Sequence, residues 1–121
     1  MAHVLIIDDD QSILDLLALI FSTKGHRTTT ANDGEDGLRL ALDQTFDLVI
    51  TDLNMPKVTG WDIIAKIKSS ETVSSVPILA LSAHSTANDK DAAYSAGCDA
   101  YVTKPFDPEK LLDVAESVLK A

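Results

Sequence analysis

Charged side chains follow three short apolar runs of this chain, and their types could do chemistry together. Short apolar runs bounded by polar residues predict buried strands of a parallel sheet. The carboxyl ends of parallel strands share one edge of the sheet, where ligands bind. We therefore expect the side chains after these runs to converge at that edge. They are Asp8, Asp9 and Asp10 after residues 4–7, Asp52 after residues 48–51, and Lys104 after residues 100–103.

Carboxylates gathered at one edge predict a bound cation and a reactive oxygen. Like charges held close together raise each other's pKa unless a positive charge intervenes. A hard divalent ion takes oxygen ligands of this kind and keeps sites for phosphate oxygens. An aspartate oxygen can attack a phosphoryl group to give an acyl phosphate. Lys104 would place a positive charge on that group, and the hydroxyl of Ser82, after the apolar run 77–81, could donate to it.

Strand and helix patterns alternate along the chain and predict the elements that position these residues. The sequence predicts strands at residues 4–7, 27–31, 48–51, 77–81 and 100–103. It predicts helices between Asp10 and Gly25, over residues 34–44 and 61–69, between Thr86 and Gly97, and from Pro108 to Ala121. Asp10, Thr86 and Asp107 are the expected N-caps. Five strand–helix repeats predict a single-domain α/β fold, a doubly wound parallel sheet with helices on both faces.

Apolar spacing predicts which face of each helix is buried. In the first helix, the buried stripe is expected at Ile13, Leu16, Leu17, Ile20 and Phe21. Leu14 and Ala18 lie off that stripe and are expected at the surface, where Leu14 could be a docking contact. In the second helix, the expected inward residues are Leu38, Ala41 and Leu42.

Composition excludes several classes of protein. The net charge of −9 and the absence of a basic stripe argue against direct nucleic-acid binding. The sequence contains no run of about 18 apolar residues, so it predicts no membrane-spanning helix. The N-terminal residues lead into a predicted strand and do not show the pattern of a signal peptide. The single cysteine, Cys98, excludes an internal disulfide, and we expect it to be a small residue packed in the interior. We expect a cytoplasmic domain.

Four segments together identify a family resemblance. They are residues 4–10, 47–56, 77–83 and 96–106. With these segments the chain resembles the receiver domain of two-component response regulators, and within that family the stand-alone chemotaxis type. The resemblance covers residues 1–121 as one domain without an output domain, and implies a flavodoxin-like sheet of strand order 2-1-3-4-5.

The resemblance implies a role for each residue of the acidic edge. Asp52 would accept the phosphoryl group, and Lys104 would contact it. The metal, Mg2+ with Mn2+ as an alternative, would be held by Asp9 directly, by Asp8 mainly through water, by Asp52, and by the backbone carbonyl of Asn54. The chain would promote only its own phosphorylation and dephosphorylation, and so would not be an enzyme acting on a separate substrate.

The resemblance also implies a switch and its partners. Ser82 would move toward the phosphate, and the ring of Tyr101 would turn inward. The surface of residues 86–97, 100–103 and the helix from Pro108 would then change and regulate a downstream protein. The donor would be a histidine kinase or a histidine phosphotransfer protein. The chain would be a monomer or a weak phosphorylation-dependent dimer, and the bond from Lys104 to Pro105 would be cis.

Two other functions use similar residues. An Mg2+-dependent phosphatase of the aspartyl-phosphate type also pairs Asp with Lys, but it usually has a second acid two residues after the nucleophile, where this chain has Asn54. A flavodoxin-like carrier would need a Ser-, Thr- and Gly-rich phosphate loop after the first strand. Three aspartates stand there instead. His84, two residues after Ser82, is expected to face solvent, and its alternative place is over the phosphoryl site.

Overall fold

Ten alternating elements form the fold, which we describe from a computed structural model that places residues 2–84 and 86–119. The strands are β1 (His3–Ile7), β2 (Arg27–Ala31), β3 (Leu48–Asp52), β4 (Ile78–Ser82) and β5 (Ala100–Thr103). The helices are α1 (Gln11–Thr23), α2 (Gly34–Asp43), α3 (Gly60–Lys68), α4 (Ala87–Ala96) and α5 (Pro108–Leu119). The expected end of the last helix at Ala121 lies outside the described residues.

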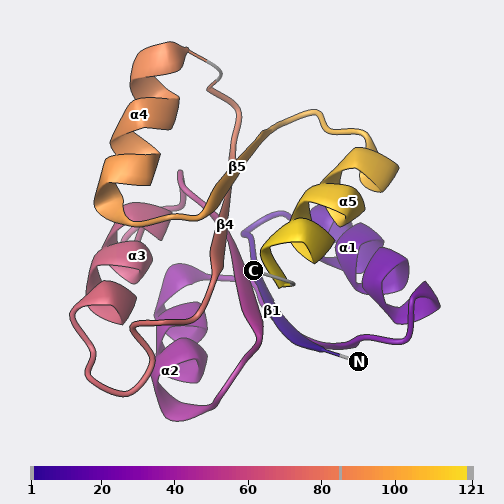
Figure 1. The fold of residues 1–121 in the computed structure, drawn as a ribbon, viewed down its shortest axis with the longest axis horizontal. Helices are drawn as coiled ribbons and strands as arrows, with labels where there is room; N and C mark the ends of the chain where they lie inside the picture. The colour runs from indigo at the N-terminus through magenta and orange to yellow at the C-terminus, as the bar shows by residue number, and fades with distance from the viewer. Residues whose placement is uncertain (1, 85, 120–121) are drawn as a thin grey trace.

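The sheet is parallel throughout, with strand order β2-β1-β3-β4-β5. Each crossover contains one helix, and the helices cover both faces (Figure 1). The doubly wound, flavodoxin-like α/β fold predicted from the sequence is therefore confirmed. No helix of residues 2–84 or 86–119 is long and apolar enough to cross a membrane.

Two aliphatic cores lie on the two faces of the sheet. Alternate strand residues point to opposite faces, so neighbours such as Leu5 and Ile6 belong to different cores. α1 and α5 cover the core that contains Ile6, while α2, α3 and α4 cover the core that contains Leu5. Because both faces are covered, the central strands β1, β3 and β4 contain runs of consecutive apolar residues, 4–7, 48–50 and 78–81.

The buried face of α1 differs from the predicted one. Leu14 is 1% exposed and belongs to the core together with Leu17 and Phe21, so its prediction as a surface residue is wrong. Leu16 is 38% exposed, and Leu19 is 62% exposed. Residues 16–21 are all apolar, and so are residues 13 and 14, so several stripes fit the sequence equally well. Packing against the sheet and α5 selects the stripe through Leu14.

The buried face of α2 is made of small residues. Gly34, Gly37 and Ala41 are buried, whereas Leu42 is 38% exposed and Leu38 is only partly buried. The prediction of Leu42 as an inward residue is therefore wrong. A search for large apolar side chains misses a helix face that is built from glycine and alanine.

The predicted caps are confirmed. The Asp10 carboxylate accepts from the Ser12 backbone N–H at 2.9 Å, and the Thr86 hydroxyl accepts from the Asp89 N–H at 3.2 Å. Asp107 accepts from the Glu109 N–H at 3.0 Å, directly before Pro108 begins α5. These caps fix where α1, α4 and α5 begin, next to the carboxyl ends of the strands.

Candidate functional site: an acidic edge of the sheet

Strand register brings the predicted site residues to one edge. Ile7 of β1 pairs with Thr51 of β3, so Asp8 and Asp52 are the next residues along two adjacent strands. On the other side, Asp52 pairs with Leu81 of β4, which directly precedes Ser82. Ser82 pairs with Thr103 of β5, and Lys104 follows. The register thus aligns the ends of four strands.

The distribution of buried polar side chains identifies the same edge of the sheet. The buried polar side chains among the described residues are Asp8, Thr51, Asp52 and Ser82, and all four lie at these strand ends. Burying a carboxylate costs free energy unless it is hydrogen-bonded or paired. Such costs are concentrated at functional sites more often than in the rest of a core.

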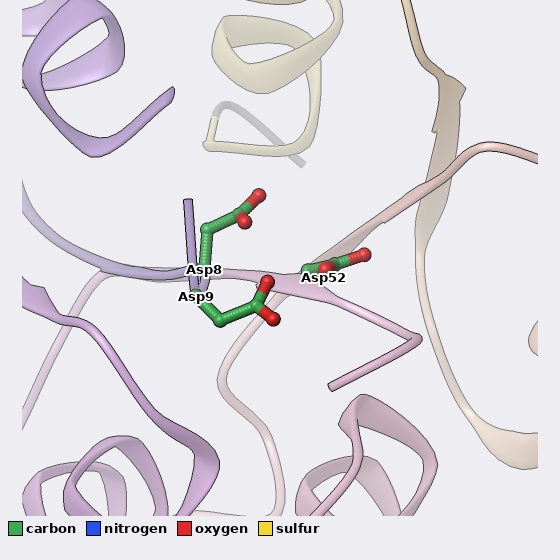
Figure 2. Close-up of side chains that lie close together, drawn as sticks. All are labelled: Asp8, Asp9 and Asp52. Atoms are coloured by element: carbon green, nitrogen blue, oxygen red, sulfur yellow. The ribbon is translucent and has the colours of Figure 1, made fainter. Parts of the chain in front are cut away.

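Three carboxylates face a common space. Asp8, Asp9 and Asp52 each offer a carboxylate oxygen, and these oxygens all lie within 4.8 Å of one another (Figure 2). Asp8 and Asp52 are buried, whereas Asp9 is exposed. This donor set consists only of hard oxygens and carries up to three negative charges. It fits a hard divalent cation such as Mg2+.

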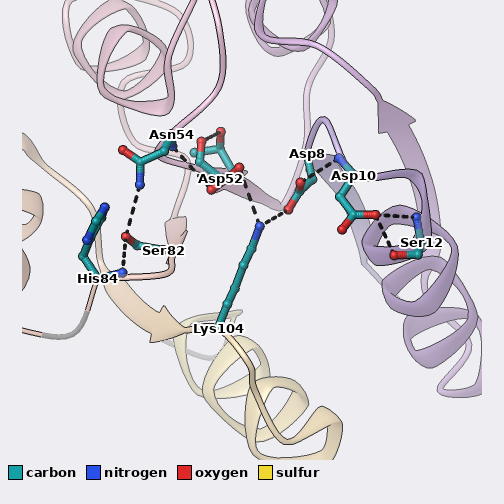
Figure 3. A network of polar contacts seen from close by, with 9 residues as sticks. Asp8, Asp10, Ser12, Asp52, Asn54, Ser82, His84 and Lys104 are labelled. Atoms are coloured by element: carbon teal, nitrogen blue, oxygen red, sulfur yellow. Dashed lines mark hydrogen bonds and ion pairs between the residues drawn. The ribbon is translucent and has the colours of Figure 1, made fainter.

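Lys104 extends between the two buried carboxylates. Its Nζ lies 2.8 Å from Asp8 Oδ2 and 3.6 Å from Asp52 Oδ2 (Figure 3). Its peptide bond to Pro105 is cis, as the resemblance implies. One ammonium therefore serves two buried carboxylates, and Asp9 adds a third negative charge. The edge keeps an excess of negative charge.

The pKa values of the edge follow from this arrangement. Burial raises the pKa of Asp8 above its ordinary value, and the hydrogen bond from Lys104 offsets only part of that rise. Burial, and then the charge of Asp8, raise the pKa of Asp52. Burial lowers the pKa of Lys104, but the hydrogen bond and charge of Asp8, with the charge of Asp52, outweigh burial and give a net rise.

A chain of polar contacts runs from Asp52 toward the surface. The Asn54 backbone N–H donates to Asp52 Oδ1 at 3.4 Å, and Asn54 Nδ2 donates to Ser82 Oγ at 3.5 Å (Figure 3). The His84 N–H also donates to Ser82 Oγ, at 3.0 Å. The Tyr101 hydroxyl donates to the His84 carbonyl oxygen at 2.5 Å. The backbone of His84 therefore connects Ser82 with Tyr101.

The structure brings together most of the residues that the sequence proposed. Asp8, Asp9, Asp52 and Lys104 form the acidic edge itself, and Asn54 and Ser82 are one contact away. Asp10 stands apart: it is exposed, and hydrogen bonds from Ser12 lower the pKa of its carboxyl.

His84 is exposed, as expected, and its contribution comes through the backbone. Sequence reasoning missed this link between Ser82 and Tyr101. A backbone N–H and carbonyl are present at nearly every position, so the residue type gave no signal.

Comparison with known proteins agrees with this site. The family model of the response regulator receiver domain matches residues 4–116. The chain is 37% identical over 120 residues to the response regulator ArlR of Staphylococcus aureus, covering 99% of this chain and 53% of ArlR. It is 36% identical over 120 residues to RpaA of Synechocystis sp., a DNA-binding dual master transcriptional regulator, covering 99% of this chain and 50% of RpaA. The chain spans about half the length of these relatives.

Solved structures show the same fold. The chemotaxis response regulator CheY4 of Vibrio cholerae has a TM-score of 0.92 and 32% identity, and the match covers 98% of both chains. The receiver domain of a sensor histidine kinase from Pseudomonas aeruginosa has a TM-score of 0.90 and 25% identity, covering 99% of this chain and 98% of that one. That domain was crystallised with a magnesium ion coordinated in its active-site cleft. On the family match, the shared fold and the acidic edge together, this chain belongs to the response regulator receiver domain family.

Proposed function

We propose that the chain is a phosphorylation-driven switch that accepts a phosphoryl group on the Asp52 carboxylate. One observation carries the proposal: oxygens of Asp8, Asp9 and Asp52 lie within 4.8 Å of one another, with Lys104 Nζ 3.6 Å from Asp52 Oδ2. A nucleophilic oxygen, a set of cation ligands and a fixed ammonium thus share one small space. Phosphoryl transfer requires mainly such positioning and charge neutralisation.

In the proposed transfer, an Asp52 carboxylate oxygen attacks the phosphorus of a phosphohistidine. The new P–O bond forms as the P–N bond breaks, and the electron pair of that bond remains on the imidazole nitrogen, which takes up a proton. Lys104 would hold its positive charge toward the phosphoryl oxygens, and the Ser82 hydroxyl, which is linked to Asp52 through Asn54, would donate to one of them. The donor would be a histidine kinase or a histidine phosphotransfer protein.

The proposed metal ligands are Asp8, Asp9, Asp52 and the backbone carbonyl of Asn54. Asp9 would bind directly, and Asp8 mainly through water. Bound Mg2+, or Mn2+ in its place, would neutralise charge on the phosphoryl oxygens. Clustered hard oxygens support this assignment, because three carboxylates share one space with a single ammonium, that of Lys104, beside the two buried ones.

The proposed output is a change of the surface formed by α4, β5 and α5. Tyr101 of β5 is partly buried and is tied to Ser82 through His84. A phosphoryl group that draws Ser82 inward would release this arrangement, and the changed surface would regulate a protein partner. We propose that the chain acts in the cytoplasm, as a monomer or a weak phosphorylation-dependent dimer, without contacting nucleic acid itself. Its charge of −9 supports the last point.

The aspartyl-phosphate phosphatase gains no support from the comparisons. Asn54 lies where such an enzyme needs an acid, and it donates hydrogen bonds to Asp52 and Ser82 instead.

A labelled histidine phosphotransfer protein, mixed with the chain and Mg2+, tests the proposal. We expect the chain to gain label, Asp52→Asn to gain almost none, and a chelator to stop the transfer in the parent. Equal labelling of Asp52→Asn and the parent would overturn the proposal.

A further inference from the structure

The loop between β3 and α3, residues 53–59, carries Asn54 and lies between two glycines of different helices. Gly34 begins α2 and Gly60 begins α3, and both are buried. A side chain at either position would meet backbone on the loop or at its start. At Gly34, a Cβ would overlap the Val58 carbonyl oxygen and lie 2.8 Å from its carbon. At Gly60, a Cβ would overlap the Asp52 carbonyl oxygen and lie 2.7 Å from Leu53 Cα.

The contact at Gly34 cannot be relieved by turning a side chain. The nearest atoms belong to the backbone of Val58, so either the loop or α2 must move. α2 has little freedom to move away, because Gly37, one turn later, packs against the Ile7 side chain: a Cβ there would lie 2.7 Å from Ile7 atoms. Buried interiors are close-packed and pass such displacements on to their neighbours. We therefore expect the loop, and not α2, to move when a side chain is added at Gly34.

The other end of the loop is equally fixed. The Gly60 N–H donates to the Leu53 carbonyl oxygen at 3.2 Å, so the loop closes on itself next to Asp52. Thr59 and Asp62 form a reciprocal capping box that fixes the start of α3. Lys57 holds a left-handed backbone, with φ of 66°, between these two points. The path of the loop is thus determined by backbone contacts with α2 and α3.

We propose that Gly34 and Gly60 are positioning residues of the metal site, because their lack of side chains sets the path of residues 53–59. The inference rests on the proposed function, in which Asn54 of this loop supplies a carbonyl ligand. Mg2+ requires near-ideal octahedral geometry at about 2.0–2.1 Å, so a ligand displaced by about 1 Å is lost. Gly34 would act from a helix that contributes no ligand of its own.

Mg2+ titration of Gly34→Ala, followed by Trp61 fluorescence and by calorimetry, tests the inference. We expect circular dichroism to show a folded protein and the Mg2+ Kd to rise at least tenfold, with amide chemical shifts displaced over residues 53–59. Gly60→Ala should behave in the same way. Gly25→Ala is the matched control: Gly25 has φ of 82° and open space around it, so this variant should lower Tm and leave the Mg2+ Kd within twofold.

A second variant keeps the test informative if Gly34→Ala does not fold. Val58→Gly adds no atom and leaves the backbone contact with Gly34 in place, but it gives the loop backbone more conformational freedom, so it should raise the Mg2+ Kd severalfold. A folded Gly34→Ala or Val58→Gly protein with the parent's Mg2+ affinity would overturn the inference and leave the proposed function intact. Failure of the parent itself to bind Mg2+ would overturn the proposed function, and the positioning role with it.

Discussion

At the scale of single residues, the acidic edge holds more negative charge than its own lysine neutralises. Asp8 has no exposed surface and Asp52 only 5%, yet Lys104 is the one cationic side chain that pairs with them among residues 2–84 and 86–119. Lys104 lies closer to Asp8, which leaves Asp52 as the less compensated of the two. A carboxylate that is held near a cation site and is not saturated by hydrogen bonds keeps a lone pair for an incoming phosphorus. This difference favours Asp52 as the nucleophile.

Removal of the exposed carboxylate should weaken metal binding. We expect Asp9→Ala to raise the Mg2+ Kd at least tenfold, because a direct carboxylate ligand is lost. Calorimetric titration measures the change. Asp10→Ala is the control, since Asp10 is exposed and caps α1, and it should bind Mg2+ as the parent does. Tight binding by Asp9→Ala would refute the assignment of Asp9.

Neutralisation of Asp52 should stabilise the metal-free protein. Burial and Asp8 raise the folded-state pKa of Asp52 above its ordinary 3.8, so the ionised group opposes folding at neutral pH. That cost is absent below the unfolded-state pKa and complete above the folded-state pKa. At pH 7, Asp52→Asn should therefore raise Tm by about 3–6 °C, the scale of roughly 1 kcal/mol in a domain of this size.

Thermal unfolding across pH checks the origin of that gain. In a chelator-containing buffer, the difference in Tm between Asp52→Asn and the parent should shrink as the pH falls toward 3.8. A difference that stays constant with pH would mean that the gain has another cause than charge. A lower Tm for the variant at pH 7 would contradict the repulsion at this edge.

At the scale of elements, the end of β4 and the middle of β5 are joined through the backbone of one residue, His84. The His84 N–H donates to Ser82, and its carbonyl accepts from Tyr101. A phosphoryl oxygen offers the Ser82 hydroxyl a charge-assisted acceptor, whereas its present partners, Asn54 Nδ2 and the His84 N–H, both donate to it. Movement of Ser82 would disturb the turn at His84 and change the position of Tyr101. An effector shifts such an equilibrium only through its different affinity for the two states.

Removal of the Ser82 hydroxyl should uncouple the two elements. We expect Ser82→Ala to accept phosphate. The chemical-shift changes of residues around Tyr101 on adding beryllofluoride and Mg2+ should fall to less than half of those in the parent. Heteronuclear NMR measures both proteins. Ser95→Ala, on an exposed position of α4, is the control and should respond as the parent does. Equal responses in Ser82→Ala and the parent would show that another group makes the link.

The sequence predicted the bounds of the strands and helices better than it predicted which face of each helix is buried. Alternating apolar runs and helical patterns are local signals, so all five strands and five helices were expected within a few residues of their observed bounds. Which side of α1 is buried depends on what packs against it, because residues 16–21 are apolar on every side. The face of α2 through Gly34 and Gly37 carries no hydrophobic signal at all, although it is fixed by close contact.

The acidic edge was predictable for a different reason. Parallel order and strand-end position together determine which residues meet, so Asp8, Asp9, Asp52 and Lys104 could be brought together without coordinates. The contacts of Ser82 with Asn54 and His84 depend on loop geometry, which no spacing rule specifies. The role of each residue in metal binding and phosphorylation stays a prediction.

At the scale of the whole molecule, one edge of the sheet holds the buried polar side chains of the described residues, and the rest of the interior is largely aliphatic. Both cores consist almost entirely of aliphatic side chains, and Cys98, as predicted, is one packed residue among them. Burial raises the pKa of its thiol to about 11, which keeps it protonated at neutral pH. Among the described residues, the buried charged side chains are Asp8 and Asp52 of the acidic edge, and a ligand that binds there only in the folded state stabilises the entire domain.

Magnesium should stabilise the domain by mass action. A ligand that binds only the folded state adds RT ln(1 + [L]/Kd), or about 2.7 kcal/mol at a concentration one hundred times Kd. We expect Tm to rise with Mg2+ concentration and to return to its starting value with a chelator. The same titration of Asp9→Ala should give little change. A Tm that does not respond to Mg2+ in the parent would contradict cation binding at the acidic edge.

The central claim is that a phosphoryl group becomes attached to the Asp52 carboxylate. Incubation with acetyl phosphate and Mg2+, followed by borohydride reduction and peptide mass mapping, identifies the modified residue, since reduction of an aspartyl phosphate leaves homoserine. We predict one homoserine, at position 52, and loss of the phosphoryl group in hydroxylamine before reduction. A hydroxylamine-resistant phosphoryl group, or one attached to a serine or histidine, would contradict the account.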